Sequence, residues 1–163
     1  IDTGSLREGT LFFVIILMFI GASPGSTGGG IKTTTAAVLL FSLVSTVTGK
    51  TNLPVFHRQI PQQTTNKAFT VFLMSALLVV TVTMVLTFTE NAPLLKLLFE
   101  VTSAFGTVGL STGITPTLSC AGKAALIATM FAGRVGSLTL IMALALQKRN
   151  GTVQYPTGKV MIG

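Results

Sequence analysis

A glycine-spaced stretch in the second half of the sequence holds the residues best suited to bind an ion. It consists of Gly106, Thr107, Val108, Gly109 and Leu110. Glycine adopts backbone conformations closed to other residues, and unpaired carbonyl groups along an extended segment can replace the hydration shell of a monovalent cation. The Thr107 hydroxyl would add one more oxygen. The pattern favours a cation site made of backbone carbonyls, and an external loop after a short interfacial helix is the alternative.

A second glycine-rich stretch interrupts a long apolar segment near the start of the sequence. Its residues of interest are Gly21, Ala22, Ser23, Pro24, Gly25, Ser26, Thr27, Gly28, Gly29, Gly30 and Lys32. Five glycines and one proline within ten positions exclude a regular helix. Its apolar flanks would put this stretch near the middle of a membrane. A flexible polar strand there can block a pore or swing aside. One alternative is a helix break that only relieves packing. The other is a phosphate-binding loop, but the spacing from Gly25 to Lys32 is one residue off that pattern.

Two cations lie in or beside apolar segments, where a charge costs at least about 2.5–3.5 kcal/mol on insertion scales. Lys32 either lies deep in the membrane or extends to its cytoplasmic side. Arg134 lies near the centre of an apolar segment, too far from either end to reach water easily. We expect Arg134 to face a watery cavity or an acidic or carbonyl partner, where it would raise the barrier to cations. Alternatively, Arg134 pins the interrupted segment through backbone carbonyls.

The overall composition indicates a membrane protein. The 163 residues are 49% hydrophobic and only 9% charged, and they include 17 glycines. An average soluble domain is about 25% charged. The net charge of +7 comes from basic residues that are too scattered to form a nucleic-acid-binding stripe. With one cysteine (Cys120), one histidine (His57) and four acidic residues, we expect no disulfide, metal cluster, catalytic dyad or enzyme activity.

The apolar runs predict the elements that position these residues. Ser5 and Glu8 have the spacing of a capping box, which predicts a helix that starts at Ser5. Ser119 is a predicted cap for the last helix. We expect an interrupted helix over 1–48 with its break at 21–35, a basic loop over 49–67, a spanning helix over 68–89, a short helix over 93–105 with an extended return over 106–113, a last spanning helix over 119–146, and a tail over 147–163.

The positive charges predict the orientation of these segments. The loop over 49–67 and the tail over 147–163 are both basic, so we expect both to be cytoplasmic. The segment between the two spanning helices then begins and ends outside the cell. A short helix with an extended return meets that requirement without crossing, which predicts a re-entrant loop.

Several of these motifs together resemble one known family. Thr107-Val108-Gly109-Leu110, preceded by Thr102 to Gly106, resembles a selectivity filter of the Trk/Ktr/HKT superfamily of potassium transporters. The stretch from Gly21 to Thr35 is similar to the intramembrane gate loop in the third repeat of that family. The residues around Arg134 are similar to the last helix of its KtrB-like members, where an arginine faces the pore. The resemblance covers essentially the whole chain.

The resemblance implies an all-α membrane protein built of M1-P-M2 re-entrant pore-loop repeats, four of which form a pseudo-tetramer in the intact subunit. On this basis the chain, which begins Ile1-Asp2-Thr3, is expected to be part of a longer polypeptide. It would hold the second helix of the third repeat and the whole fourth repeat. In the fourth repeat, M1 would be 68–89, the pore helix 93–105, the filter 106–113 and M2 119–146.

The function implied by the resemblance is potassium uptake across a bacterial plasma membrane. K⁺ would be the transported ion and Na⁺ a regulatory one. The family also implies a homodimer with a cytoplasmic C-terminus. A cytosolic KtrA-like nucleotide-binding ring would dock on the loop that contains Arg58 and the tail that contains Tyr155. A non-conducting membrane scaffold, and a TrkH-like rather than KtrB-like transporter, stay open as alternatives.

Overall fold

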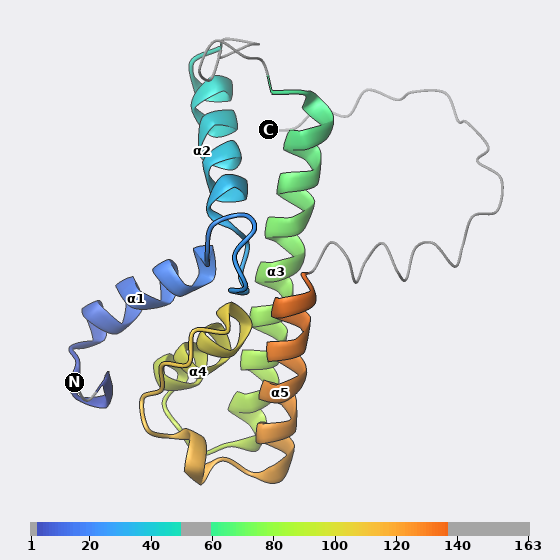
Figure 1. Ribbon diagram of the computed structural model, residues 1–163. Helices are drawn as coiled ribbons and strands as arrows, with labels where there is room; N and C mark the ends of the chain where they lie inside the picture. The colour runs from blue at the N-terminus through green and yellow to red at the C-terminus, as the bar shows by residue number, and fades with distance from the viewer. Residues whose placement is uncertain (1–2, 50–59, 137–163) are drawn as a thin grey trace, which may run out of the picture.

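The computed structural model describes residues 3–49 and 60–136, and the regular elements in these residues are all helices (Figure 1). The elements are η1 (Thr3–Ser5), α1 (Glu8–Ile20), α2 (Thr33–Val47), α3 (Gln62–Thr89), α4 (Leu94–Gly106), η2 (Thr115–Thr117) and α5 (Cys120–Val135), where η denotes a 3-10 helix. The all-helical prediction is therefore confirmed for the described part of the chain. Arg58 and Tyr155 lie outside it.

The first apolar segment is divided into α1 and α2. Gly21, at the end of α1, has a φ of 69°, and Lys32, just before α2, has a φ of 81°. Both angles lie in the left-handed region, which a continuing α-helix cannot use. Thr33 to Thr35 belong to α2, so the non-helical segment is 21–32 and is shorter than expected. We call residues 21–32 the glycine loop.

The predicted capping box at the start of α1 is wrong. Helix α1 begins at Glu8 after Arg7, without a side-chain cap, and Ser5 ends η1 instead. In this segment the Thr3 hydroxyl donates to the Ser111 carbonyl. That contact, together with the bond from the Leu6 N–H to the Thr3 carbonyl at 3.4 Å, holds the segment in a 3-10 turn. Ser5 is therefore not the extended residue that an N-cap requires.

Helix α3 is the only described helix that is long and apolar enough to cross a membrane, judged by length and composition. Its 28 residues extend about 42 Å at 1.5 Å per residue. It begins at Gln62 rather than at Ala68, because Pro61 stops the helix whereas the polar residues after it do not. The helices α1 and α2 are apolar but shorter, with 13 and 15 residues.

Helix α4 lies at the centre of the described structure. Pro93 precedes it, and every residue from Phe99 to Gly106 is buried. Phe99 packs with Leu11, Ile15 and Met18 of α1, while the other face of α4 packs against α3 and α5. The C-terminal half of α4 is therefore enclosed by α1, α3 and α5, and this holds the end of the helix in a fixed place.

Helix α5 lies alongside α3 (Figure 1). The predicted cap is confirmed, because the Ser119 hydroxyl accepts a hydrogen bond from the Gly122 N–H at 3.1 Å. The helix ends at Val135, and Gly136 follows with a φ of 85°. Arg134 is therefore in the last turn of α5 and not at the centre of a continuous helix over 119–146, as expected from the sequence. Residues 137–146 lie outside the described part.

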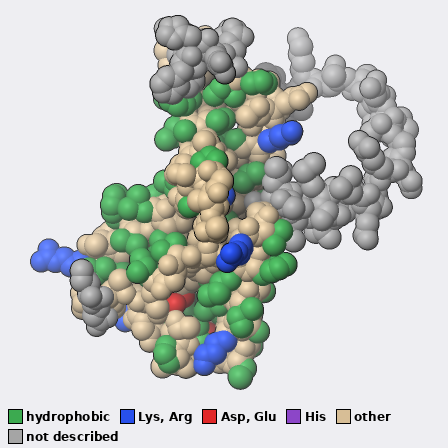
Figure 2. All heavy atoms as spheres, in the orientation of Figure 1, with side chains coloured by type: hydrophobic (Ala, Val, Ile, Leu, Met, Phe, Trp, Pro, Cys, Tyr) green, Lys and Arg blue, Asp and Glu red, His purple; other side chains and the backbone are tan. Residues whose placement is uncertain are grey.

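Large apolar side chains cover much of the outer surface. Phe12 and Phe13 of α1, Val80 and Phe88 of α3, and Ile127 of α5 are all more than half exposed. Figure 2 shows hydrophobic side chains across one face of the molecule, with few charged side chains between them. An exposed apolar surface of this extent fits a chain that is surrounded by lipid or by further protein.

Candidate functional site

A tight turn at the end of α4 leads into the candidate filter. The Thr107 N–H donates to the Ala104 carbonyl at 3.1 Å, and the Val108 N–H donates to the Ser103 carbonyl at 3.0 Å. This pair of bonds is a Schellman motif, in which the left-handed residue is usually glycine. Here it is Thr107, with a φ of 50° and a ψ of 40°. A non-glycine residue in this region costs about 1–3 kcal/mol, and such strain concentrates at functional sites.

The residues after Thr107 have no regular structure. Residues 108–112 are neither helix nor strand, and Gly109 has a φ of 84° with open space around it. Val108 and Leu110 are exposed on either side of it. Helix α4 directs its partly negative C-terminal end toward this segment. A segment without ladder partners has carbonyl groups that can bind a cation.

The glycine loop contacts the start of the candidate filter. The Gly29 N–H donates to the Thr107 hydroxyl at 2.8 Å, across 78 residues of sequence. In Figure 1 the loop between α1 and α2 reaches the end of α4. The sequence indicated these two stretches separately, and the structure brings them into direct contact.

Three glycines make this close approach possible. A Cβ atom at Gly29 would lie 2.6 Å from the Phe105 carbonyl oxygen, and one at Gly106 would lie 2.8 Å from the Met18 carbonyl oxygen. A Cβ atom at Gly133 of α5 would overlap the same Phe105 oxygen. The glycine loop, α1, α4 and α5 therefore meet at backbone-to-backbone distance around the end of α4.

The base of the glycine loop is fixed and its tip is exposed. The Ile31 N–H donates to the Phe19 carbonyl at 3.3 Å, and the Thr33 N–H donates to the Ala22 carbonyl at 3.2 Å. The Lys32 ammonium donates to the Gly28 carbonyl at 2.5 Å and to the Ser26 carbonyl at 3.4 Å. Residues 23–27 are exposed. Lys32 thus folds back onto the loop that precedes it.

Arg134 lies beside this junction. It is exposed, and it follows Gly133, the residue that packs on the Phe105 carbonyl. Within residues 3–49 and 60–136, the loop carbonyls of Gly28 and Ser26 accept hydrogen bonds from Lys32, and none is bonded to Arg134. The described contacts therefore assign the carbonyl-binding role to Lys32.

Sequence reasoning missed two glutamates that organise the segment between α3 and α5. Glu100 of α4 accepts hydrogen bonds from Ser111, Thr112 and Thr115. Glu90, just after α3, accepts from the backbone N–H and the hydroxyl of Ser119. The available signal was weak: these are two of only four acidic residues in the chain, and the stretch after Glu100 contains several serines and threonines.

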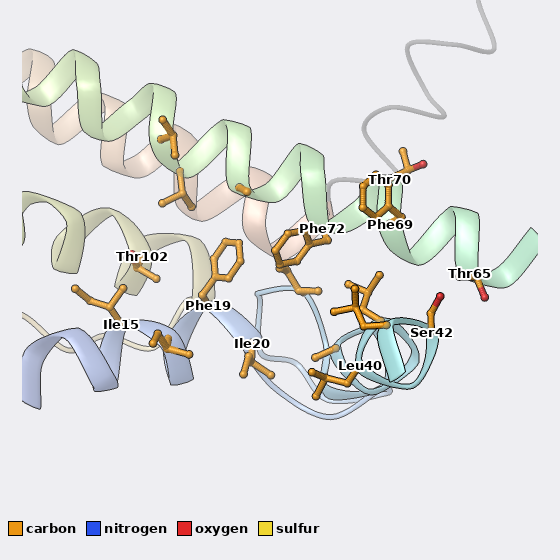
Figure 3. Close-up of a pocket in the computed structure, with 18 of the residues that line it drawn as sticks. Ile15, Phe19, Ile20, Leu40, Ser42, Thr65, Phe69, Thr70, Phe72 and Thr102 are labelled. Atoms are coloured by element: carbon orange, nitrogen blue, oxygen red, sulfur yellow. The ribbon is translucent and has the colours of Figure 1, made fainter. Parts of the chain in front are cut away.

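An apolar cavity of about 870 Å³ lies away from the filter, among α1, α2, α3 and α4. Figure 3 shows Thr102 at the α4 end of the cavity, Phe19 and Phe72 near its middle, and Leu40 and Ser42 on the α2 side. The rings of Phe19 and Phe72 meet edge to face with centroids 6.0 Å apart. Its lining is almost entirely hydrocarbon, so this cavity does not suit an ion.

The phosphate-loop alternative does not fit the geometry. Such loops follow a β-strand and cradle phosphate with their backbone N–H groups. Here the glycine loop follows helix α1, and the Lys32 side chain is bonded to loop carbonyls.

Among the described residues, no group of three His, Cys, Asp or Glu side chains could hold a metal ion.

Comparison with known proteins identifies the family. Residues 1–153 match the family of TrkH cation transport proteins. The chain belongs to this family. The resemblance to the Trk/Ktr/HKT superfamily is thus confirmed, and a location in the membrane follows from it.

Bacterial relatives match the whole chain. It is 46% identical to the Ktr system potassium uptake protein D and 44% identical to the Ktr system potassium uptake protein B, both of Bacillus subtilis (strain 168). It is 38% identical to the potassium/sodium uptake protein NtpJ of Enterococcus hirae. In each case 100% of this chain is covered, but only 36–38% of the relative's length. The KtrB-like resemblance is supported by the first two.

Proposed function

We propose that this chain is the C-terminal part of a Ktr-type potassium uptake protein. In the intact protein, K⁺ would pass down its electrochemical gradient through a pore formed by four M1-P-M2 repeats. The names of the relatives support potassium as the substrate. The observation that carries the proposal is the end of α4, where a buried half-helix leads through a strained Thr107 into a segment without regular structure.

Residues 106–110 form the selectivity filter of the fourth repeat in this proposal. The carbonyls of this segment, with the Thr107 hydroxyl, would replace water around the ion. Glu90 and Ser119 are hydrogen-bonded to each other, so the segment between them leaves and returns to one end of α3. This supports a re-entrant loop, since the segment does not need to cross the membrane.

The glycine loop is the gate in this proposal. Its docking on the Thr107 hydroxyl supports a place below the filter, in the path of an ion that leaves it. Its exposed tip and its fixed base support a hinged movement of residues 23–28, in which Lys32 releases its carbonyl partners. Arg134 would add a positive charge at the same level and raise the barrier to cations.

The family resemblance also suggests the assembly. We propose a homodimer in the bacterial plasma membrane with several spanning helices and a cytoplasmic C-terminus. A cytosolic KtrA-like nucleotide-binding ring would dock on the surfaces that contain Arg58 and Tyr155. Na⁺ would act as a regulatory ion. The names of the two Ktr-system relatives support only the coarser point that such a protein is one component of a larger system.

The test is uptake by the protein expressed from its complete gene, in cells that lack their own K⁺ uptake systems. We expect Rb⁺ uptake that depends on this protein. If the protein reaches the membrane together with its regulatory subunit and no uptake follows, the non-conducting scaffold is the better interpretation. Replacing Gly109 by Ser should weaken the preference for K⁺ over Na⁺, and an unchanged preference would argue against a role of Gly109 in the filter.

A further inference from the structure

Glu100 is a buried carboxyl group surrounded by hydrogen-bond donors. Its side chain is only 5% exposed. Its Oε1 atom accepts from the Thr112 N–H at 2.9 Å, the Thr112 hydroxyl at 3.2 Å and the Ser111 hydroxyl at 2.7 Å. Its Oε2 atom accepts from the Thr115 hydroxyl at 2.8 Å. Burying a carboxyl group is costly unless donors of this kind satisfy it.

These donors follow directly after the candidate filter, so the Glu100 contact fixes the end of that segment. At the start of the filter, the Val108 N–H is bonded to the Ser103 carbonyl of α4. At its end, the Thr112 N–H is bonded to Glu100 of the same helix. Residues 108–112 are therefore a short bridge with both ends fixed to α4.

The far anchor of this bridge has several connections. Ser111, besides donating to Glu100, accepts from the Gly113 N–H at 2.9 Å, and its hydroxyl lies 3.0 Å from that of Thr115. The Ser111 carbonyl accepts from the Thr3 hydroxyl of η1. Glu100 is the centre of this group, because it is the residue that connects it to α4.

Glu90 has the same chemistry at a different place. Its carboxylate accepts from the Ser119 N–H at 3.1 and 3.2 Å and from the Ser119 hydroxyl. Ser119 caps α5 and lies well beyond the filter. Glu90 therefore fixes the start of a helix, whereas Glu100 fixes the end of the filter, and the two form a matched pair for comparison.

We propose that Glu100 is a positioning residue for ion selectivity. By holding Ser111, Thr112 and Thr115 it sets the path of residues 108–110, and thus the spacing of the carbonyl oxygens offered to the ion. Selectivity of such a filter depends on the size of the site and on the number and field strength of its oxygens. The inference rests on the proposed function, in which these residues bind K⁺.

The experiment uses the complete protein in K⁺-uptake-deficient cells, with Glu100→Gln as the main variant. Glutamine keeps the shape of the side chain but removes the charge and one of the two acceptor oxygens. We expect the ratio of K⁺ to Na⁺ uptake to fall by up to about tenfold, a factor that corresponds to about 1.4 kcal/mol of lost discrimination between the two ions. The half-saturating K⁺ concentration should rise, while the amount of protein in the membrane stays near that of the wild type.

Two further variants test the mechanism of Glu100. Thr115→Val removes one donor without changing the shape of the side chain, and it should shift the ratio in the same direction by a smaller factor. In the double variant Glu100→Gln/Thr115→Val the two effects should not multiply, because they remove one shared interaction. If Glu100→Gln does not reach the membrane, Thr115→Val alone decides.

Glu90→Gln is the control, and it should leave the ion ratio unchanged. The inference is overturned if Glu100→Gln has wild-type selectivity and half-saturation, or lowers only the maximal rate and the amount of protein. It is equally overturned if Glu90→Gln changes the ratio as much as Glu100→Gln does. A wild-type protein that supports no uptake at all would instead contradict the proposed function.

Discussion

Thr107 combines backbone strain with a long-range hydrogen bond. Its left-handed conformation is unfavourable for a β-branched residue, and its hydroxyl accepts the buried Gly29 N–H. The backbone just before Thr107 is closely packed: the Phe105 carbonyl lies against Gly29 and Gly133, and the Met18 carbonyl lies against Gly106. A glycine at 107 would relieve the strain but would lose the bond to the glycine loop.

Thr107→Val tests that bond. Valine has the shape of threonine but offers no acceptor, so the Gly29 N–H would stay buried without a partner, at a cost of about 1–3 kcal/mol. We expect faster deuterium exchange in the peptide that contains Gly29, whereas Thr107→Ser, which keeps the hydroxyl, should exchange like the wild type. Unchanged exchange in Thr107→Val would show that the bond does not hold the loop.

Gly133→Ala tests the close packing of α5 on α4. The new Cβ atom would overlap the Phe105 carbonyl oxygen, and overpacking of this kind costs about 1–3 kcal/mol. We expect a lower Tm of the purified protein in detergent. Gly9→Ala is the matched control: it lies in α1 with nothing within 4 Å of the added Cβ, so it should stabilise slightly. Equal Tm values for both variants would contradict the contact.

At the scale of the elements, helix α3 contains a buried hydroxyl group that no other described residue satisfies. The Thr83 hydroxyl is buried, and within the described part of the chain it has no hydrogen-bond partner. Thr83→Val should therefore raise the free energy of unfolding by about 1 kcal/mol, measured as a higher Tm. Thr129→Val is the control, because the Thr129 hydroxyl donates to the Ala125 carbonyl at 2.8 Å. Loss of that hydrogen bond should not raise the Tm. A lower Tm for Thr83→Val would mean that the hydroxyl has a partner elsewhere.

The glycine loop, as an element, makes its own prediction. Deleting Ser23–Gly28 removes the exposed tip but leaves Gly29 and its docking bond. If the tip obstructs the pore, Rb⁺ uptake without the regulatory subunit should rise. Thr27→Ala, which keeps the loop length, should not change it. A fall in uptake, with normal amounts of protein in the membrane, would contradict a gating role.

How far the sequence predicted these elements depended on the range of the interactions. The break between α1 and α2 and the Ser119 cap come from local chemistry, namely glycine, proline and a serine at a helix start. The sequence of one short segment was therefore enough to predict each of them. The predicted start of α1 was wrong, and the segment before α1 makes a contact that a local pattern does not encode, from Thr3 to Ser111, 108 positions away. The length of α5 differed because apolar composition continues past Gly136, whereas the backbone at that glycine does not remain helical.

The candidate site was predicted in its parts but not in its connections. Glycine spacing pointed to residues 106–110 and to the glycine loop, because glycines in an apolar sequence indicate a backbone that is neither helix nor strand. The contact from Gly29 to Thr107 depends on how α1, α4 and α5 pack around the glycine loop, and no local pattern encodes it. The role of Glu100 was missed for the same reason: its partners are hydroxyl residues that become neighbours only after the chain turns at Thr107.

At the scale of the whole molecule, the chain covers little more than a third of the length of its relatives. One filter segment cannot surround an ion, and the exposed Val108 and Leu110 fit a site completed by further segments. We expect ordered Rb⁺ density beside Thr107 to Gly109 in a structure of the complete protein with Rb⁺. A fully resolved filter without such density in high Rb⁺ would favour a non-conducting subunit.

The bond between Glu90 and Ser119 also has a consequence for the conformational entropy of the segment between α3 and α5. It joins two residues that are 29 positions apart at one end of α3 and α5. Once these helices stand side by side, the contact closes the intervening segment into a ring. The closed segment, which includes α4, has fewer conformations than an open one, so the bond lowers the conformational entropy that is lost when α4 packs.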